Sequence, residues 1–386
     1  MSRVAVVGGG AGGLMAAEVL ATAGVDVTVF ERMPSVGRKL LLAGRGGLNL
    51  THSEGLEAFL DRYGPARPRL EAAIRAFGPD DLRAWAAGLG EETFVGSSGR
   101  VFPTSFRATP LLRAWLRRLD QLGVDIRVRT EWRGEDEADA TVLALGGGSW
   151  PRVGSDGAWV ATLADAGIDV RPLRPANCGF TTRWSDAFRT RFAGTPLKNV
   201  RLSGGGGSAR GDAMVTDAGI EGGAVYALAA GLRDAIDAGG PTELLVDLHP
   251  DRTVDELAER LANRRPKDSR SSALRRAGVS PVGIGLAREA TGNQPPDGAG
   301  ALAALLKAVP VALVGVQPLA RAISSAGGIA LDEVDDTFML RHRPGTFVAG
   351  EMLDWEAPTG GYLLQATFST AVAAARGAIG WVRDRT

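Results

Sequence analysis

Residues 3–31 constrain the fold of this chain more than any other segment, because they have the pattern of a complete β-α-β unit. Arg3–Val7 is a short apolar run, typical of a buried parallel strand. Met15–Ala23 predicts a helix that ends at Gly24, and Val25–Phe30 predicts a second strand. The segment therefore predicts an α/β protein built on a parallel sheet.

The turn between the first strand and the helix carries glycines at GxGxxG spacing. Gly8 permits a tight turn, Gly10 lets the backbone approach a pyrophosphate, and Gly13 lets helix and strand pack closely. Glu31 ends the second strand, where a ribose hydroxyl needs an acceptor. The chain has 53 glycines, so the spacing is informative only within this strand-helix-strand-acid context. The segment predicts a Rossmann-like dinucleotide site with contacts at Gly8, Gly10, Ala11, Gly12, Gly13, Glu31 and Arg32; the alternative is a glycine-rich turn that binds nothing.

The motif leaves the dinucleotide open. Glu31 suits the adenosine ribose of FAD or of NAD, and it disfavours the 2′-phosphate of NADP at this position.

Residues 37–52, with the sequence GRKLLLAGRGGLNLTH, are too rich in glycine for us to expect a regular element. Their glycines let the backbone lie against a flat or phosphorylated ligand, and their arginine, lysine, asparagine and threonine side chains offer hydrogen-bond donors. Loops of this length in α/β domains are commonly functional, although a flexible surface loop is the alternative. The predicted cofactor contacts are Arg38, Lys39, Gly44, Asn49, Leu50 and Thr51.

Two further strand ends are candidate contacts with the dinucleotide. Ala140–Leu145 predicts a strand that runs into three glycines, and Thr346–Ala349 predicts one that ends at Gly350 and Glu351. Ligands of open α/β sheets bind outside the carboxyl ends of the strands. The contacts predicted here are Ala144, Gly146, Gly147, Gly350 and Glu351.

A C-terminal helix is predicted to open at Thr359-Gly360-Gly361 and to run to about Ile379. Its free N–H groups would stabilise negative charge on a ring system. The alternative is a capped helix that only packs on the sheet. Gly360, Gly361 and Tyr362 are the predicted contacts.

Two elements between these blocks are also predicted. Thr93–Phe102 has the pattern of a hairpin that turns at Ser98-Gly99. Thr109–Leu122 predicts a helix with Thr109 as its cap and Pro110 at the first helical position.

The middle of the chain changes character. Short β-like runs fill the segment after Pro172, with Gly204–Gly207 as a hairpin loop, and a helical pattern follows Thr253. We therefore expect a discontinuous dinucleotide-binding domain over residues 1–174 and 327–386, a β-rich domain over 175–252 and 309–326, and a helical domain over 253–308. A local basic run in the helical part indicates a solvated face, or else an anionic substrate or RNA: Arg260, Arg264, Arg265, Lys267, Arg270, Arg275 and Arg276.

Composition limits the function. The 44 basic and 44 acidic residues cancel, so no global footprint for nucleic acid or anionic membrane exists, and we expect neither as a partner. The single cysteine, Cys178, excludes an intrachain disulfide and a two-cysteine redox relay. No apolar run reaches the length of a membrane span, and the N-terminus leaves no room for a signal peptide. We therefore expect a cytoplasmic protein. The three histidines lack metal-ligand spacing, so no metal is expected.

Five blocks together resemble the HI0933-like flavoproteins, also called BaiN-like NAD(P)/FAD-dependent oxidoreductases. They are VVGGGAGGLMAA, GRKLLLAGRGGLNLTH, GRVFPTSFRA, LALGGGSWPRVGSDG, and GGIALDEVD with AGEMLDWEAPTGGYLLQATFS. The resemblance covers nearly the whole chain and implies an FAD domain interrupted by a β-rich and a helical domain. It implies FAD pyrophosphate at Gly8, Gly10, Gly12 and Gly13, and ribose at Glu31. It implies flavin or ribityl contacts at Lys39, Asn49, Gly350, Glu351, Gly361 and Tyr362.

The chain departs from the family at one point. The usual loop reads like GGGRCN, whereas this chain has Leu48 where the cysteine stands, so no role of that thiol carries over.

Three functions remain open. The first is an FAD-dependent oxidoreductase that acts on an unsaturated or carbonyl small molecule. Because no second GxGxxG unit exists, either NADH or NADPH would enter transiently as its reductant, or the reductant would be another protein. The second is an RNA-modifying flavoprotein, which the basic run favours and the zero net charge disfavours. The third is a flavin-binding protein without turnover. The sequence identifies no catalytic acid or base.

Overall fold

The computed structural model describes residues 2–132, 138–240, 242–263 and 269–385. These form two compact units. The first unit comprises Met1–Arg174 and Ile323–Thr386, and the second comprises Pro175–Ala322. The division of the second unit into a β-rich and a helical domain stays a prediction.

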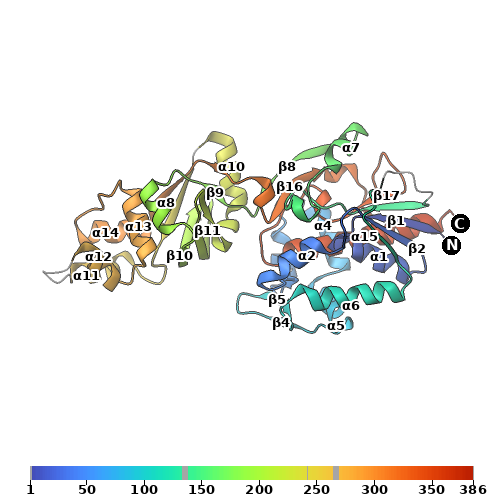
Figure 1. The fold of residues 1–386 in the computed structure, drawn as a ribbon, viewed down its shortest axis with the longest axis horizontal. Coiled ribbons are helices and arrows are strands. Elements are labelled where there is room, and N and C mark those ends of the chain that lie inside the picture. Colours follow the sequence, from blue (N-terminus) through green and yellow to red (C-terminus); the bar gives the residue numbers. More distant parts are fainter. Residues whose placement is uncertain (1, 133–137, 241, 264–268, 386) are drawn as a thin grey trace. The chain divides into compact units, whose positions relative to one another are not determined.

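A five-stranded sheet in the order β17-β7-β1-β2-β6 forms the centre of the first unit, and every neighbouring pair is parallel. Figure 1 labels three of its strands, β17, β1 and β2. Its strands bury Val and Ala side chains on both faces, which explains their continuous apolar runs. The strands are β1 (Arg3–Val7), β2 (Asp26–Glu31), β6 (Asp125–Val128), β7 (Ala140–Leu143) and β17 (Thr346–Val348). The sequence prediction of a Rossmann-like parallel sheet is confirmed.

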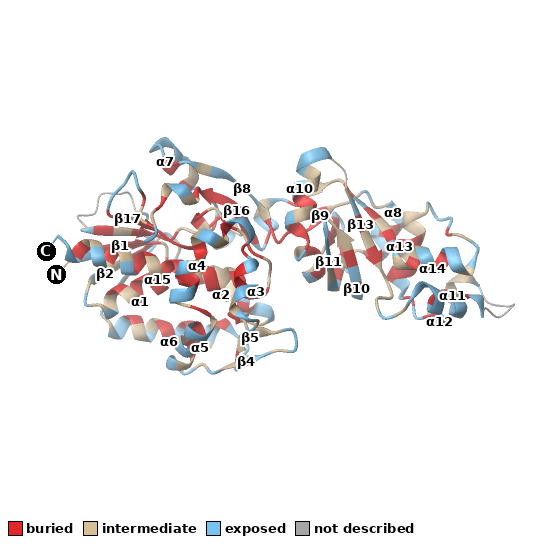
Figure 2. Ribbon diagram, turned by 180° about the vertical axis from the view of Figure 1, so that it is seen from behind, coloured by how far each residue is buried: buried red, intermediate tan, exposed pale blue. Residues whose placement is uncertain are grey.

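Two long helices pack together beside this sheet. Helix α1 (Ala11–Thr22) lies against α15 (Tyr362–Arg383), and α15 also contacts α4 (Arg67–Ala76). Their buried faces form one continuous core with the strands (Figure 2). The remaining helical segments of the first unit are α2 (Arg38–Ala43), α3 (Leu56–Asp61), α5 (Pro79–Gly88), α6 (Ala108–Gln121), α7 (Trp159–Asp165) and the 3₁₀ turns at Gly44–Gly46, Gly64–Ala66, Pro151–Val153, Leu331–Glu333 and Gly350–Met352.

Two small sheets complete the first unit. One has the order β3-β5-β4, with β3 at Thr51–His52, β4 at Thr93–Val95 and β5 at Arg100–Pro103. The antiparallel pairing of β4 and β5 confirms the predicted hairpin. The other sheet joins β8 (Val170–Ala176) to β16 (Ser324–Ile329).

The structure corrects two local predictions. Residues 37–52 are not free of regular elements, because Leu40 is buried and anchors the helical turn of α2, while the glycines stand at its ends. Thr109 does not cap α6. The helix begins at Ala108, two residues before Pro110, with the extended Arg107 at the cap position, and Ala108 is buried close to Gly44.

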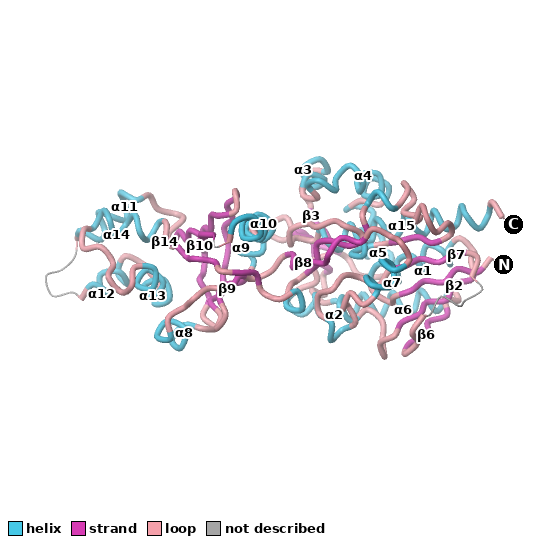
Figure 3. The backbone as a smooth tube through the Cα atoms, turned by 90° about the horizontal axis from the view of Figure 1, so that it is seen from above, coloured by secondary structure: helices cyan, strands magenta, loops and turns pink. Residues whose placement is uncertain are grey.

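The second unit is built on a seven-stranded antiparallel sheet in the order β14-β13-β10-β11-β12-β9-β15. Figure 3 shows its helices beside these strands. The strands are β9 (Phe180–Thr181), β10 (Pro196–Gly204), β11 (Gly207–Val215), β12 (Gly219–Glu221), β13 (Thr242–Asp247), β14 (Val309–Leu313) and β15 (Gly315–Val316). The helical segments are α8 (Asp186–Phe192), α9 (Gly223–Tyr226), α10 (Ala229–Gly239), α11 (Val254–Ala262), α12 (Arg270–Arg276), α13 (Pro281–Ala290), α14 (Ala299–Lys307) and a 3₁₀ turn at Leu319–Arg321.

The glycines at 204–207 form the turn of a hairpin, as the sequence predicts. Strands β10 and β11 pair up to Gly204 and Gly207, and the two glycines between them have φ values of 57° and 79°.

Candidate functional site

The predicted cofactor residues come from segments far apart in the sequence but gather at one edge of the parallel sheet. Gly8 follows β1, Glu31 ends β2, Ala144 follows β7, and Gly350 comes soon after β17. Because all these strands are parallel, their carboxyl ends meet at this edge, where open α/β sheets bind ligands. The sheet topology thus assembles one candidate site.

The glycine turn has the geometry that each glycine was predicted to provide. Gly8 has φ of 106°, and a Cβ at Gly13 would lie 1.8 Å from the Gly8 carbonyl oxygen. A Cβ at Gly10 would meet no atom within 4 Å, so the backbone there is open. Ala11 and Gly12 begin α1, and a Cβ at Gly12 would lie 3.3 Å from Cγ2 of Thr367. The open side of the turn is therefore at Gly10.

The Glu31 carboxylate ties the end of β2 to the glycine turn. Oε2 accepts a hydrogen bond of 2.9 Å from the Gly9 N–H, and Oε1 accepts one of 2.7 Å from the Met33 N–H. Each carboxylate oxygen has a further acceptor position, which leaves capacity for a ribose hydroxyl. Arg32 instead turns to the segment after the 3₁₀ turn at Pro151–Val153, where it pairs with Asp156 at 2.7 Å.

Lys39 and Glu351 form an ion pair at this edge. Lys39 Nζ lies 2.6 Å from Glu351 Oε2 and 2.8 Å from Ser149 Oγ. Glu351 Oε1 accepts a 2.8 Å hydrogen bond from the N–H of Ser325. The lysine and glutamate side chains are 29% and 15% exposed, so the pair is shielded but reachable.

The loop after β7 is held by hydrogen bonds from several sides. Trp159 Nε1 donates to the Gly146 carbonyl at 2.8 Å, and Ser155 Oγ donates to the Gly147 carbonyl at 3.1 Å. A Cβ at Gly147 would lie 2.4 Å from Ser325 Oγ, and one at Gly8 would lie 2.4 Å from the Ala144 carbonyl oxygen. Gly147 and Gly8 are thus needed for close packing here, whereas Gly146 has φ of 71° and a Cβ there would lie 3.5 Å from Ser155 Oγ.

Three buried polar atoms in residues 37–52 have no hydrogen-bond partner: Arg38 Nε, Asn49 Oδ1 and Thr51 Oγ1. Buried polar groups are nearly always satisfied, so such atoms call for an explanation, and an absent polar ligand supplies one. Gly44 and Leu50, by contrast, are packed against atoms of the protein itself. A Cβ at Gly44 would lie 2.5 Å from Ala108 Cβ, and Leu50 is fully buried, so both support the loop from within.

The start of α15 packs tightly against this loop. Gly361 has φ of 100°, and a Cβ there would lie 2.5 Å from backbone atoms of Thr51. Gly360, the preceding residue, also has a positive φ of 139°. Further along α15, Thr370 Oγ1 accepts a hydrogen bond of 3.0 Å from the N–H of Gly350. The space beside Gly361 is therefore filled by the chain itself, and the helix terminus and the loop are one packed assembly.

Tyr362 belongs to a cluster of ionisable groups, of which Glu54 and Arg62 lie in no motif of the sequence. Its hydroxyl donates to Glu54 Oε1, and Glu54 also accepts a bidentate pair of hydrogen bonds from Arg62 at 3.1 and 2.7 Å. The His52 ring stacks on Tyr362 with centroids 5.4 Å apart. The Arg62 hydrogen bond lowers the pKa of Glu54, while burial and the Glu54 hydrogen bond raise the pKa of Tyr362. The cluster holds a neutral phenol against an ionised carboxylate.

The structure brings most predicted site residues to one edge and adds Ser149, Ser325, Glu54 and Arg62. Ser149 directly follows the predicted glycine cluster and could have been found there. The other three lie in segments without a local motif.

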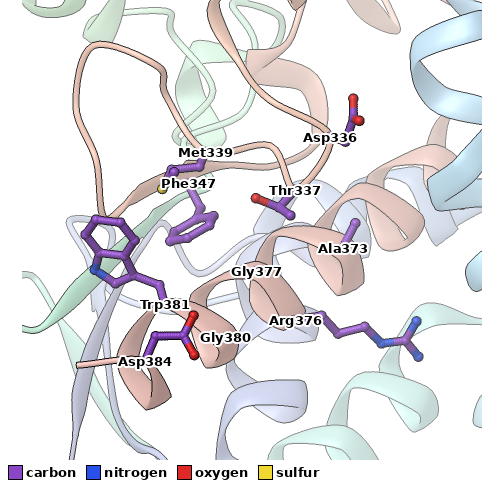
Figure 4. Close-up of a pocket in the computed structure, with 10 residues that line it drawn as sticks. All are labelled: Asp336, Thr337, Met339, Phe347, Ala373, Arg376, Gly377, Gly380, Trp381 and Asp384. Atoms are coloured by element: carbon purple, nitrogen blue, oxygen red, sulfur yellow. The ribbon is translucent and has the colours of Figure 1, made fainter. Parts of the chain in front are cut away.

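One depression of about 430 Å³ lies elsewhere in the first unit, against the C-terminal half of α15 (Figure 4). Met339, Phe347 and Trp381 supply its apolar lining, and Asp336, Arg376 and Asp384 supply its charges. It contains none of the predicted cofactor residues, so it is separate from the candidate site.

Among the described helices, none is long and apolar enough to cross a bilayer. Within the same residues, no three His, Cys, Asp or Glu side chains gather in a way that could hold a metal ion.

Two characterised relatives match much of the chain. The 3-dehydro-bile acid delta(4,6)-reductase of Clostridium scindens is 26% identical over 98% of this chain and 99% of its own length. The ribosomal RNA dihydrouridine synthase of Haemophilus influenzae is 27% identical over 70% of each chain.

Solved structures share the fold at low sequence identity. The 3-ketosteroid delta1-dehydrogenase of Sterolibacterium denitrificans aligns with a TM-score of 0.54 at 12% identity, over 98% of this chain and 100% of its own. A flavocytochrome c3 fumarate reductase aligns with a TM-score of 0.51 at 14% identity, over 98% of this chain and 78% of its own.

The family profile described as HI0933-like protein Rossmann domain matches residues 2–377. This match confirms the predicted family and, with it, the class of FAD-dependent oxidoreductases that the resemblance implies. The chain therefore belongs to the HI0933-like protein family.

Proposed function

We propose that this protein is an FAD-dependent reductase that saturates a carbon–carbon double bond conjugated to a carbonyl group in a small molecule. The open backbone at Gly10, beside the carboxylate of Glu31, is the observation that carries the cofactor part of this proposal. The two named relatives support the type of reaction that we propose.

Both named relatives perform the same type of chemistry on different molecules. A delta(4,6)-reductase of a 3-dehydro bile acid acts on double bonds conjugated to the 3-carbonyl group. Dihydrouridine is uridine whose ring double bond, conjugated to a carbonyl, has been saturated. In each case hydride adds to one carbon and a proton to its neighbour. An activated C=C bond is therefore the shared substrate feature that we assign to this chain.

In this proposal the adenosine ribose binds at Glu31 and the pyrophosphate binds over Gly10 at the N-terminus of α1. That helix supplies free N–H groups and partial positive charge to the phosphates. The chain has no acidic residue in the first turn of α1, so nothing there repels them. The remaining predicted contacts stay proposals: Gly8, Ala11, Gly12, Gly13, Arg32, Arg38, Gly44, Asn49, Leu50, Thr51, Ala144, Gly146, Gly147, Gly350, Gly360 and Gly361.

The flavin would lie between the unsatisfied polar atoms of residues 38–51 and the pair Lys39–Glu351. When bound, FAD supplies hydride transfer, while the protein orients it and sets its electrostatics. The Lys39 ammonium and the N-terminus of the 22-residue α15 both favour negative charge near the ring. Glu351 holds Lys39 in place, and the hydrogen bond from Tyr362 to Glu54 fixes the phenol at the start of α15.

We further propose NADH or NADPH as the transient reductant. No second dinucleotide fingerprint follows the first in the sequence, so the nicotinamide would approach the flavin without a domain of its own.

RNA modification is the second candidate, favoured by the relative from Haemophilus influenzae. The basic run supports it weakly. Arg270 is paired with Asp297 and donates to the Pro295 carbonyl at 2.9 Å, so its charge is used within the unit. Arg264, Arg265 and Lys267 lie outside the described residues.

An anaerobic reductive titration tests the proposed function. NADH or NADPH should bleach the flavin absorbance of the purified protein, and 1,4-androstadiene-3,17-dione, a conjugated ketone, should then restore it. The matched arm replaces the steroid with uridine-containing ribosomal RNA. Reoxidation by RNA alone would favour the second candidate. If neither NADH nor NADPH reduces the flavin, the proposal that a nicotinamide nucleotide is the reductant is contradicted.

A further inference from the structure

Three phenylalanines form an exposed aromatic surface beside the proposed flavin loop. Phe94 and Phe106 are 42% and 44% exposed, and both are among the few large apolar side chains that the described residues leave open to water. The rings of Phe94, Phe102 and Phe106 lie 5.0 to 6.4 Å apart, with angles of 25° to 39° between their planes. They form one continuous face, here called the phenylalanine platform.

The hairpin register explains why these rings share a face. Phe94 of β4 pairs directly with Phe102 of β5, so their side chains project to the same side. The neighbouring pair, Val95 and Val101, projects to the other side. Strands β4 and β5 lie at the same end of the first unit as α2 (Figure 1).

Phe106 joins the platform to the cofactor loop. The Leu48 N–H donates to the Phe106 carbonyl at 3.3 Å. A Cβ at Gly47 would lie 2.4 Å from Cζ of Phe106, so the ring rests directly on the glycine backbone. The platform is therefore continuous with the Gly44–Asn49 segment, where the flavin would bind.

The backbone at Phe106 is strained in order to hold this ring. Its φ is 59°, a left-handed conformation that is unfavourable for a bulky side chain. A Gly or Asn at this position would relieve the strain but would leave the platform without its inner ring. Strain that persists where it places a side chain at a binding surface indicates a use for that side chain.

We propose that the phenylalanine platform binds a flat, apolar ring system of the substrate and sets it against the flavin loop. This inference deepens the proposed function, on which it rests, by identifying the surface that selects the substrate. Three phenyl faces bind rings through dispersion and apolar burial. Phenyl faces can also stack on nucleobases, so the choice of a fused hydrocarbon ring rests on the bile acid reductase, which matches 98% of this chain. Exposed apolar patches of this kind commonly mark ligand sites.

The test measures binding of 1,4-androstadiene-3,17-dione to the FAD-loaded protein by equilibrium dialysis. Phe94→Ser should weaken binding by about 3- to 10-fold, the range expected for losing one aromatic contact. Val95→Ser is the matched control, because Val95 is 46% exposed in the same strand but projects from the opposite face, and it should change affinity less than twofold. If Phe94→Ser loses FAD, Phe94→Leu retains the apolar hairpin and carries the test.

Three results would contradict substrate binding at the phenylalanine platform. They are no saturable binding of the steroid, unchanged steroid affinity in the Phe94 variants, or a loss of steroid affinity in Val95→Ser equal to that in Phe94→Ser. Dissociation of a dimer by Phe94→Ser, seen by light scattering, would make this face a contact between two copies instead. Loss of RNA binding in Phe94→Ser, with steroid binding unchanged, would make it an RNA surface. Dialysis needs no turnover, so a failed flavin reduction contradicts the proposed reaction without touching this result.

Discussion

Gly10 is the position where the cofactor hypothesis can be tested without damage to the protein itself. It has φ of −80°, and a side chain there would meet no atom of the chain within 4 Å. Gly8 and Gly13 cannot serve in this way, because a Cβ at either would collide with backbone.

We predict that Gly10→Val folds normally and binds FAD at least about tenfold more weakly, a loss of about 1.4 kcal/mol. The branched side chain would occupy the space that the pyrophosphate needs. Gly298→Val is the matched control, because Gly298 also precedes a helix, has φ of −72° and has open space around it. Flavin fluorescence titration of the apoproteins measures both. Equal FAD affinity in the two variants would place the pyrophosphate elsewhere.

Glu31→Ala should weaken FAD binding by about 1–3 kcal/mol, because a charged acceptor for the ribose is lost. Asp26→Ala, at the exposed start of the same strand, should leave the affinity unchanged. The same titration decides the outcome. Some loss of stability is also expected, since Glu31 holds the N–H groups of Gly9 and Met33. An unaltered affinity in Glu31→Ala would show that the ribose does not use this carboxylate.

Residue roles that arise within one short motif could be predicted from the sequence, whereas pairings across the chain could not. Gly8, Gly13 and Glu31 belong to a local fingerprint, and the structure gives the two glycines the tight packing that the fingerprint requires. Lys39 and Glu351 are 312 positions apart, and each was predicted separately as a flavin contact. Only the folded sheet shows that they pair with each other.

At the scale of elements, the segment of residues 37–52 and the start of α15 depend on each other. The backbone of Thr51 occupies the space beside Gly361, and the hydroxyl of Tyr63 donates to the Tyr362 carbonyl at 2.8 Å. Both segments were predicted from the sequence to contact the cofactor, but residues 37–52 were expected to form no regular element. Their glycine content hid the helical turn of α2, because composition does not show that Leu40 becomes buried.

Two substitutions on α15 should have opposite effects on the free energy of unfolding. Gly361→Ala should lower it by about 1–3 kcal/mol and reduce FAD content, because the residue has positive φ and its Cβ would strike Thr51. Gly380→Ala should raise it by about 0.5–1 kcal/mol, since Gly380 lies in the same helix with open space beside it. Urea denaturation measures both. A Gly361→Ala variant as stable as the wild type would contradict the packing of helix and loop.

At the scale of the molecule, the chain leaves the first unit at Arg174 and returns at Ile323. The sequence predicts a discontinuous first domain, because both ends of the chain have the pattern of parallel-sheet strands and the middle does not. Helices α11–α14 form a domain of their own only if they unfold independently of the antiparallel sheet. Leu257 and Leu306 share a hydrophobic core with strand residues such as Val246.

Limited proteolysis addresses the predicted helical domain over residues 253–308. Early cleavage is expected at residues 264–276 or 293–300, with the parallel-sheet unit left intact, because the sheet core is continuous and buried. Mass spectrometry of the first fragments identifies the sites. Early cuts within residues 3–31 would contradict the predicted domain organisation.

The central claim is that the carboxyl edge of the parallel sheet binds FAD, and the identity of the cofactor in the purified protein tests it most directly. The protein should be yellow, and heat denaturation followed by chromatography should release about one FAD per chain, bound without a covalent link. Gly10→Val, purified in parallel, should release much less, whereas Gly298→Val should match the wild type. Recovery of NAD alone from the wild type, or of FAD at equal yield from Gly10→Val, would contradict the claim.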